Sequence, residues 1–220
     1  MPVTSARSMI LRTSVTALAL LALGACAKKG DLDETGGIVS VRSSCPVAAI
    51  PAQTGDVTLF NPAGSTDASA IDVVASMTNL RSTCSDSGSQ YYTEATFDVQ
   101  ATRRDASVAR EVDLPFYSVV VRGGNAVIAK RVGTVRVSFA AGQYRAQASA
   151  KGASYVDRAQ ATLPEDIQRK ITQKRKSGEE QAAIDPFTLP EVKAAMQRTS
   201  FELLVGFNLT PEQFKYNATR

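Results

Sequence analysis

The chain has 220 residues, with 25 lysines and arginines against 21 aspartates and glutamates, and it contains no histidine. Without histidine, the nucleophile systems that pair serine or cysteine with histidine are excluded, as are metal sites with histidine ligands. The formal net charge is +4, and it falls to +2 without the first 25 residues, which contain two arginines and no acid, so we expect no nucleic-acid partner.

The first 25 residues have the pattern of a secretory signal peptide. Arg7 and Arg12 precede an apolar run over residues 15–23, "VTALALLAL". As a helix this run would extend about 14 Å, roughly half of the hydrocarbon thickness of a bilayer, so it predicts a cleaved signal rather than a spanning helix. Its removal takes away two arginines and no acid, which leaves 23 basic residues against 21 acidic ones.

The signal ends at Leu23-Gly24-Ala25-Cys26, which resembles the lipobox of bacterial prolipoproteins. The resemblance implies that Cys26 receives diacylglycerol and N-acyl lipid and becomes the first residue of the mature protein, held in the membrane by its acyl chains. No other cofactor is expected. An ordinary signal peptide with an incidental Cys26 is the alternative. Ala27 is not the aspartate that marks inner-membrane retention in enterobacteria, so we expect the periplasmic face of the outer membrane.

The other two cysteines, Cys45 and Cys84, form an even pair. In an oxidising compartment such a pair predicts a disulfide, with two unpaired thiols as the alternative. The bridge would close a loop of 40 residues, counted from Cys45 to Cys84 inclusive, and would add about 4 kcal/mol through the entropy of the unfolded chain. The small, charged residues 26–44 ahead of it predict a flexible tether.

From residue 56 the sequence has the period of β-strands. Strands are predicted over 56–60, 71–78, 93–102, 110–121, 126–139 and 143–151. In three of them apolar and polar residues alternate, as in a sheet with one buried face. The predicted inward residues are Ile71, Val73, Ala75 and Met77, then Ala95, Phe97, Val99 and Ala101, then Tyr144, Ala146, Ala148 and Ala150.

The connections between these strands carry turn residues. The segment "SDSGSQ" (85–90) predicts a loop, and "RGGN" (122–125) predicts a hairpin turn. Pro115 cannot donate a hydrogen bond to a ladder, so it indicates a sheet edge or a bulge.

Helix starts follow at "TLPE" (162–165), "TLPE" (188–191) and "LTPE" (209–212). In each, threonine predicts a cap, proline is tolerated in the first turn, and glutamate faces the positive end of the helix dipole. The first helix is predicted to run to about Lys176, with Ile167 and Ile171 as its apolar stripe, and the second spans roughly 190–198.

The segment "SFELLVGFNL" then predicts the last core strand, with Phe201, Leu203, Val205, Phe207 and Leu209 on one face. Residues 45–220 are therefore expected to form a single domain, mainly β, with a helical insertion at about 164–198. We predict an antiparallel β-sandwich that is immunoglobulin- or fibronectin-like in architecture only, because the chain has no tryptophan and Cys45 precedes the first strand.

The most basic stretch contains Arg169, Lys170, Lys174, Arg175 and Lys176. The pattern is typical of a solvated helix face, and the alternative is contact with lipid phosphates, lipopolysaccharide or the acidic face of a partner. Glu94, Asp98 and Glu202 fall on outward strand positions, and no catalytic or metal-binding group is assigned.

The mature chain, which ends in "FELLVGFNLTPEQFKYN", resembles uncharacterised envelope lipoproteins of Gram-negative bacteria. The resemblance implies a location and no activity. We predict a non-enzymatic lipoprotein that binds or braces an envelope protein, through the cation-rich helix or a sheet edge near Pro115. The alternatives are a glycan- or lipid-binding module that uses strand 143–151 and Tyr144, and a histidine-independent hydrolase. No small-molecule ligand is assigned.

Overall fold

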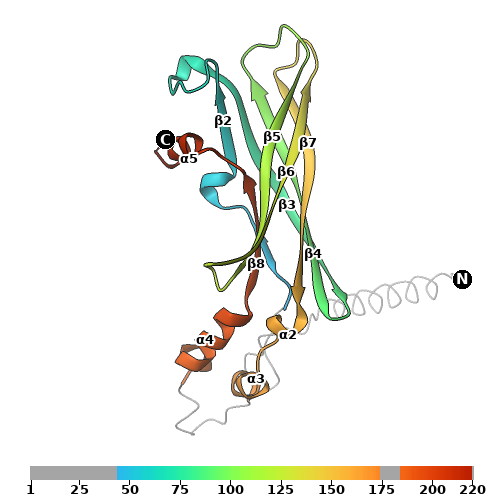
Figure 1. Ribbon diagram of the computed structural model, residues 1–220, viewed down its shortest axis with the longest axis vertical. Helices are drawn as coiled ribbons and strands as arrows, with labels where there is room; N and C mark the ends of the chain where they lie inside the picture. Colours follow the sequence, from blue (N-terminus) through green and yellow to red (C-terminus); the bar gives the residue numbers. More distant parts are fainter. Residues whose placement is uncertain (1–43, 174–183, 220) are drawn as a thin grey trace, which may run out of the picture. The chain divides into compact units, whose positions relative to one another are not determined.

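The computed structural model describes residues 44–173 and 184–219 (Figure 1). Within these ranges the chain is mainly β. Its strands are β1 (Val47–Ala49), β2 (Asp56–Phe60), β3 (Ile71–Ser87), β4 (Gln90–Arg103), β5 (Arg110–Arg122), β6 (Ala126–Phe139), β7 (Arg145–Asp157) and β8 (Phe201–Phe207). Its helices are η2 (Ala52–Thr54), η3 (Ala68–Ala70), α2 (Arg158–Ala161), α3 (Glu165–Thr172), η5 (Pro186–Thr188), α4 (Pro190–Thr199) and α5 (Pro211–Thr219).

The strands form two four-stranded sheets. Sheet 1 has the order β1-β8-β5-β6, and sheet 2 has the order β2-β3-β4-β7. Neighbouring strands are antiparallel except for β1 and β8, which run parallel with Val47 opposite Glu202. The hairpins β3–β4 and β5–β6 each remain within one sheet (Figure 1).

The hydrophobic core lies between the two sheets, and it confirms most of the predicted alternation. The ring of Phe97 on sheet 2 meets the ring of Phe116 on sheet 1 edge to face, with 5.2 Å between their centroids. The predicted inward residues that are buried are Val73, Ala75, Met77, Ala95, Phe97, Val99, Ala101, Phe201, Leu203, Val205 and Phe207. The last of these strands, β8, is interior to its sheet, as a core strand should be.

Two predictions about sheet 2 are wrong. The expected loop at 85–90 is a tight turn at Gly88 and Ser89, because β3 and β4 stay paired as far as Ser87 opposite Gln90. Tyr144 is 61% exposed rather than inward, because it belongs to the turn before β7 begins at Arg145. Alternation cannot locate the first residue of a strand when the turn itself contains an aromatic residue.

The prediction that Pro115 marks a sheet edge is also wrong, since β5 lies between β8 and β6. Sheet 1 tolerates the proline because β8 ends at Phe207, which lies opposite Phe116. No residue of β8 therefore lies opposite Pro115 to require the backbone amide proton that proline lacks. The Pro115 carbonyl accepts a hydrogen bond from the Asn208 amide at 2.9 Å, which closes the ladder at that point.

The predicted threonine caps hold at one of three helices. At α5, the Gln213 amide donates to Thr210 Oγ1, and the Thr210 amide donates to Gln213 Oε1, which is a capping box. Thr162 instead donates to the carbonyl of Arg158 in α2, and Thr188 donates to the carbonyl of Asp185 in η5. The hydroxyls of Thr162 and Thr188 therefore bond to the short helices before them and do not cap α3 and α4.

Helices α3 and α4 share a small apolar cluster of their own. Ile167 of α3 is buried with Val192 and Ala195 of α4, and Ile171 packs against them, as the predicted stripe requires. Helix α3 ends at Thr172 and the described Gln173 is not helical, so the prediction that the helix continues to about Lys176 is wrong at Gln173; residues 174–176 lie outside the described residues. None of the described helices is long and apolar enough to span a bilayer.

Arg103, at the end of β4, is 4% exposed and forms no ion pair within 44–173 and 184–219. Its guanidinium lies 5.0 Å from the centroid of the Phe139 ring. It donates to four backbone carbonyls: Val108 at 2.7 Å, Gln143 and Ala140 at 2.8 Å, and Ala106 at 3.4 Å. One side chain thus joins the β4–β5 and β6–β7 connections, and carbonyl dipoles offset its buried charge.

We predict that Arg103→Met lowers the free energy of unfolding by about 2–4 kcal/mol, because four carbonyls lose a charged donor. Urea denaturation followed by circular dichroism measures the change. Arg104→Met is the matched control, since Arg104 is exposed, and should cost less than about 0.5 kcal/mol. Equal costs for the two variants would contradict the role given to Arg103.

Candidate functional site

The described chain begins at one end of the two sheets, which we call the proximal end. This end contains the starts of β1 and β8, the β3–β4 turn and the β5–β6 turn (Figure 1). The opposite, distal end contains the β4–β5 and β6–β7 connections. The predicted lipidation residue Cys26 and most of the predicted tether lie outside the described residues.

A disulfide between Cys45 and Cys84 confirms the predicted pairing, with the two Cα atoms 6.2 Å apart. Cys45 lies just before β1 of sheet 1, and Cys84 lies on β3 of sheet 2. The bridge therefore fixes the start of the described chain to both sheets at the proximal end.

At the same end, the β5–β6 turn packs against the C-terminal half of α4. A shallow cleft of about 260 Å³ separates them. It is lined by Arg122, Gly123, Asn125, Ala126, Ala194, Gln197 and Arg198. We call these residues, together with residues 127–132 of β6, the hairpin–α4 surface.

Gly123 makes this contact possible. Its φ is +63°, in the left-handed region that favours glycine. Its amide donates to the Ser200 carbonyl at 3.0 Å. A Cβ at this position would lie 2.9 Å from the Gln197 carbonyl oxygen. The turn can therefore approach the end of α4 only with glycine at 123.

The hairpin–α4 surface carries four cations: Arg122, Lys130, Arg131 and Arg198. Lys130 donates to Asn208 Oδ1 at 3.4 Å, and its ammonium lies 5.4 Å from the centroid of the Tyr117 ring. Among the described residues, the three arginines have no ion-pair partner. The surface is therefore positively charged, with Glu202 of β8 as the acid on the adjoining strand.

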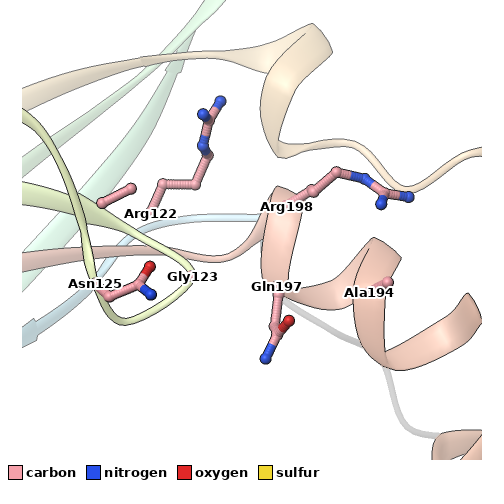
Figure 2. Close-up of a pocket in the computed structure, with 7 residues that line it drawn as sticks. Arg122, Gly123, Asn125, Ala194, Gln197 and Arg198 are labelled. Atoms are coloured by element: carbon pink, nitrogen blue, oxygen red, sulfur yellow. The ribbon is translucent and has the colours of Figure 1, made fainter. Parts of the chain in front are cut away.

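The cations do not converge on a single point. Figure 2 shows Arg122 and Arg198 extending in different directions, with Asn125 on the side of the turn and Gln197 on the side of α4. A bound anion in the cleft would thus not be held by two guanidinium groups at once. The geometry favours a spread of positive charge over a specific phosphate site.

Exposed apolar side chains accompany these cations on β6. Val127, Ile128 and Val132 are 64%, 48% and 59% exposed. β6 is the edge of sheet 1, and its ladder with β5 is irregular between Val120 and Val121, where Ile128 is the extra residue. Neighbouring exposed aliphatic and cationic residues on a strand edge indicate an interaction surface.

Of the five predicted contact cations, Arg169 and Lys170 are described. Arg169 is exposed, whereas Lys170 forms an ion pair with Glu191 at 3.0 Å. The Glu191 pKa is lowered, first by its hydrogen bond with a backbone amide and then by Lys170. Lys174, Arg175 and Lys176 lie outside the described ranges. Of the two described cations of the predicted cluster, one is therefore neutralised by an ion pair and the other is exposed.

The carboxylates considered in the sequence lie on different sheets. Glu94 and Asp98 are on the outer face of β4, and Glu202 is on β8. Hydrogen bonds lower the pKa of Glu94, chiefly from Lys151 and then from Tyr92, and that of Asp98, chiefly from Ser149 and then from Asn79. Both are thus held ionised and paired, which is opposite to the raised pKa of a general acid. Within 44–173 and 184–219, no three acidic, cysteine or histidine side chains are placed to hold a metal.

Sequence reasoning missed Arg122, Arg198 and the exposed half of β6 as parts of one surface. The "RGGN" turn was correctly predicted, but its contact with α4 joins segments that are far apart in the sequence. One signal was present: Lys130 and Arg131 interrupt an otherwise apolar run from Ala126 to Val132. Adjacent cations in such a run indicate that both faces of the strand meet solvent.

No known protein family, curated protein or solved structure matches this chain. Its function must therefore be argued from its own chemistry.

We predict that Gly123→Ala destabilises the protein more than Gly124→Ala does. Both glycines have positive φ, +63° and +80°, but only the Cβ at 123 meets backbone. Each variant should lose about 1–2 kcal/mol from the left-handed conformation, and Gly123→Ala should lose about 1–3 kcal/mol more from crowding at α4. Urea denaturation measures both, and equal losses would argue against the close contact.

Reduction of the disulfide should lower the free energy of unfolding by up to about 4 kcal/mol, because the 39-residue separation between the cysteines constrains the unfolded chain. The measurement is urea denaturation with and without dithiothreitol. The double variant Cys45→Ser/Cys84→Ser is the control and should not respond to reductant. Thiol titration verifies that the bridge is reduced, and a wild-type midpoint that is unchanged after reduction would contradict the stabilising role given to it.

Proposed function

We propose that this protein is a lipid-anchored lipoprotein of the cell envelope, attached through Cys26 to the periplasmic face of the outer membrane. Its β-rich domain serves as a non-enzymatic structural or interaction module for an envelope partner. The observation that carries the proposal is the Cys45–Cys84 disulfide.

The disulfide supports both the compartment and the modified residue. Stable disulfides form in the oxidising periplasm and are rare in the cytosol. The bridge also uses two of the three cysteines in the chain, so the third, Cys26, is the thiol left for acylation. That thiol is the one within the lipobox-like segment Leu23–Cys26.

A contact with another component of the envelope, protein or membrane, is supported by the hairpin–α4 surface. It combines three arginines that have no ion pair among the described residues with aliphatic side chains that are about half exposed or more. On sheet 2, by contrast, the outward acids Glu94 and Asp98 have polar partners and lowered pKa values. The side chains available for contact with another molecule are therefore cationic and aliphatic ones suited to binding, rather than acids suited to proton transfer.

The finer architecture, an immunoglobulin- or fibronectin-like sandwich, belongs to the same proposal. Two four-stranded sheets around a shared core support a sandwich. The order of strands does not follow the immunoglobulin pattern, because the consecutive strands β2, β3 and β4 lie side by side in one sheet. The domain therefore resembles an immunoglobulin domain in having two packed sheets, but not in the order in which the strands are connected.

We predict that Cys26→Ala releases the protein from the membrane fraction of cells into the soluble periplasmic fraction, because the acyl chains supply its membrane affinity. Cell fractionation with immunoblotting measures the release. Mass spectrometry of the wild-type protein should show residue 26 as the first residue, with the mass of a diacylglyceryl group and an additional acyl chain.

The matched control is Cys45→Ser/Cys84→Ser, which removes the other two thiols and keeps the predicted acylation site. It should remain in the membrane fraction. An unmodified residue 26 in the wild-type protein, or release of the control to the same extent as Cys26→Ala, would refute lipid anchoring.

A further inference from the structure

The hairpin–α4 surface lies at the end of the domain from which the chain leads back to Cys26. Cys45 is 19 positions after Cys26 in the sequence, and it is bridged to β3 at the proximal end. As the flexible coil that its composition predicts, a tether of this length has a root-mean-square extension of about 25 Å, which is shorter than a strand of 14 residues such as β4. A lipid on Cys26 would therefore on average hold the proximal end nearer to the bilayer than the distal end.

The residues of this surface suit the headgroup region of an anionic membrane. Arginine and lysine bind lipid phosphates, and each contributes about 1 kcal/mol of attraction near an anionic surface. Val127 and Ile128, next to the turn, are 64% and 48% exposed and can enter the boundary between headgroups and acyl chains. The surface offers both kinds of contact within one hairpin.

The arrangement favours many phosphates over one ligand. The guanidinium groups of Arg122 and Arg198 point in different directions (Figure 2), and the cleft between them is shallow. A membrane presents a continuous layer of phosphates, so cations that diverge can each find a partner there. A single small anion could satisfy only one of them.

Composition alone does not select the proximal end. The distal end also has two exposed arginines, Arg104 and Arg145, and two exposed apolar residues, Val108 and Tyr144. The difference is position, because the chain toward Cys26 leaves at the proximal end. The distal residues therefore provide a matched control of similar chemistry.

We propose that the hairpin–α4 surface is a second membrane contact, which binds anionic phospholipid headgroups and holds the domain with its β5–β6 turn against the bilayer. This inference rests on the proposed lipid anchor, which brings the surface to the membrane. Sheet 2 and the distal end would then face the periplasm.

Hydrogen–deuterium exchange on the full lipidated protein tests the contact. The protein is placed in vesicles of phosphatidylcholine alone and in vesicles of equal parts phosphatidylcholine and phosphatidylglycerol. Amides of residues 122–132 should exchange several-fold more slowly in the anionic vesicles, whereas those of the distal connection 104–109 should not change. High salt should remove the protection, because it screens charges at the membrane surface.

Two charge-reversal variants separate this contact from a general effect of charge. Lys130→Glu/Arg131→Glu changes exposed side chains of β6 and should abolish the protection. Arg104→Glu/Arg145→Glu changes the same number of charges at the distal end and should retain it. Circular dichroism verifies that both variants are folded.

Each outcome decides the proposal. Equal exchange of residues 122–132 in both vesicles, or equal loss in both variants, overturns it and leaves an acidic protein segment as the candidate occupant. Mass spectrometry of the same sample reports the lipid on Cys26 separately. A lipidated protein without protection refutes the second contact and leaves the proposed anchoring intact, whereas an unlipidated protein refutes the anchoring itself.

Discussion

The position at which the chain enters its domain is the constraint on which the proposed orientation depends. Two independent features fix it. The parallel pairing of β1 with β8 places Val47 opposite Glu202, and the disulfide joins Cys45 to Cys84 on the other sheet. Three residues of β1 alone would form a weak edge strand, and the covalent bridge compensates for that weakness. The segment that leads to Cys26 therefore meets the domain at a defined place.

Strand β6 shows how the core and the surface divide one element between them. In its second half, Val135, Val137 and Phe139 are buried. In its first half, the side chains at 127–132 are exposed on both faces. Gly133 marks the boundary: a Cβ there would lie 2.8 Å from the Phe116 ring, so that ring fills the space where a side chain of β6 would otherwise enter the core. The residues of β6 before Gly133 therefore add little to the core, and their cationic and aliphatic side chains are exposed to solvent.

The same division is visible in the charges of β6. Arg136, in the second half, lies 2.7 Å from Asp113 and 3.5 Å from Glu111 across the ladder with β5. Lys130 and Arg131 stand opposite Val119 and Ser118, which offer no charge. Cross-strand pairing thus neutralises one half of the strand and leaves the other positive. Lys130 and Arg131 form no ion pair among the described residues.

Most strands could be predicted from the sequence because each contains its own periodic pattern. The buried residues of β3, β4 and β8 follow directly from alternation, and the bounds of β6 were predicted to the residue. One error is local, because Thr188 donates to the Asp185 carbonyl only three residues upstream in η5. Another depends on a distant segment, because Pro115 is tolerated in the interior strand β5 only where β8 ends beside it. The hairpin–α4 surface belongs to the same class, since Gly123 and Gln197 meet only in the folded chain.

A diffuse membrane contact would be too weak to localise a free protein, but it is sufficient for an anchored one. Three or four cations near an anionic surface supply about 3–4 kcal/mol, and salt reduces that value. For a domain that is already tethered, docking is an intramolecular step with a high effective concentration of lipid. A preference of about 3 kcal/mol would then keep the docked state more than a hundredfold more populated than the undocked one. The acyl chains would thus determine where the protein resides, and the hairpin–α4 surface would determine which of its faces meets the periplasm.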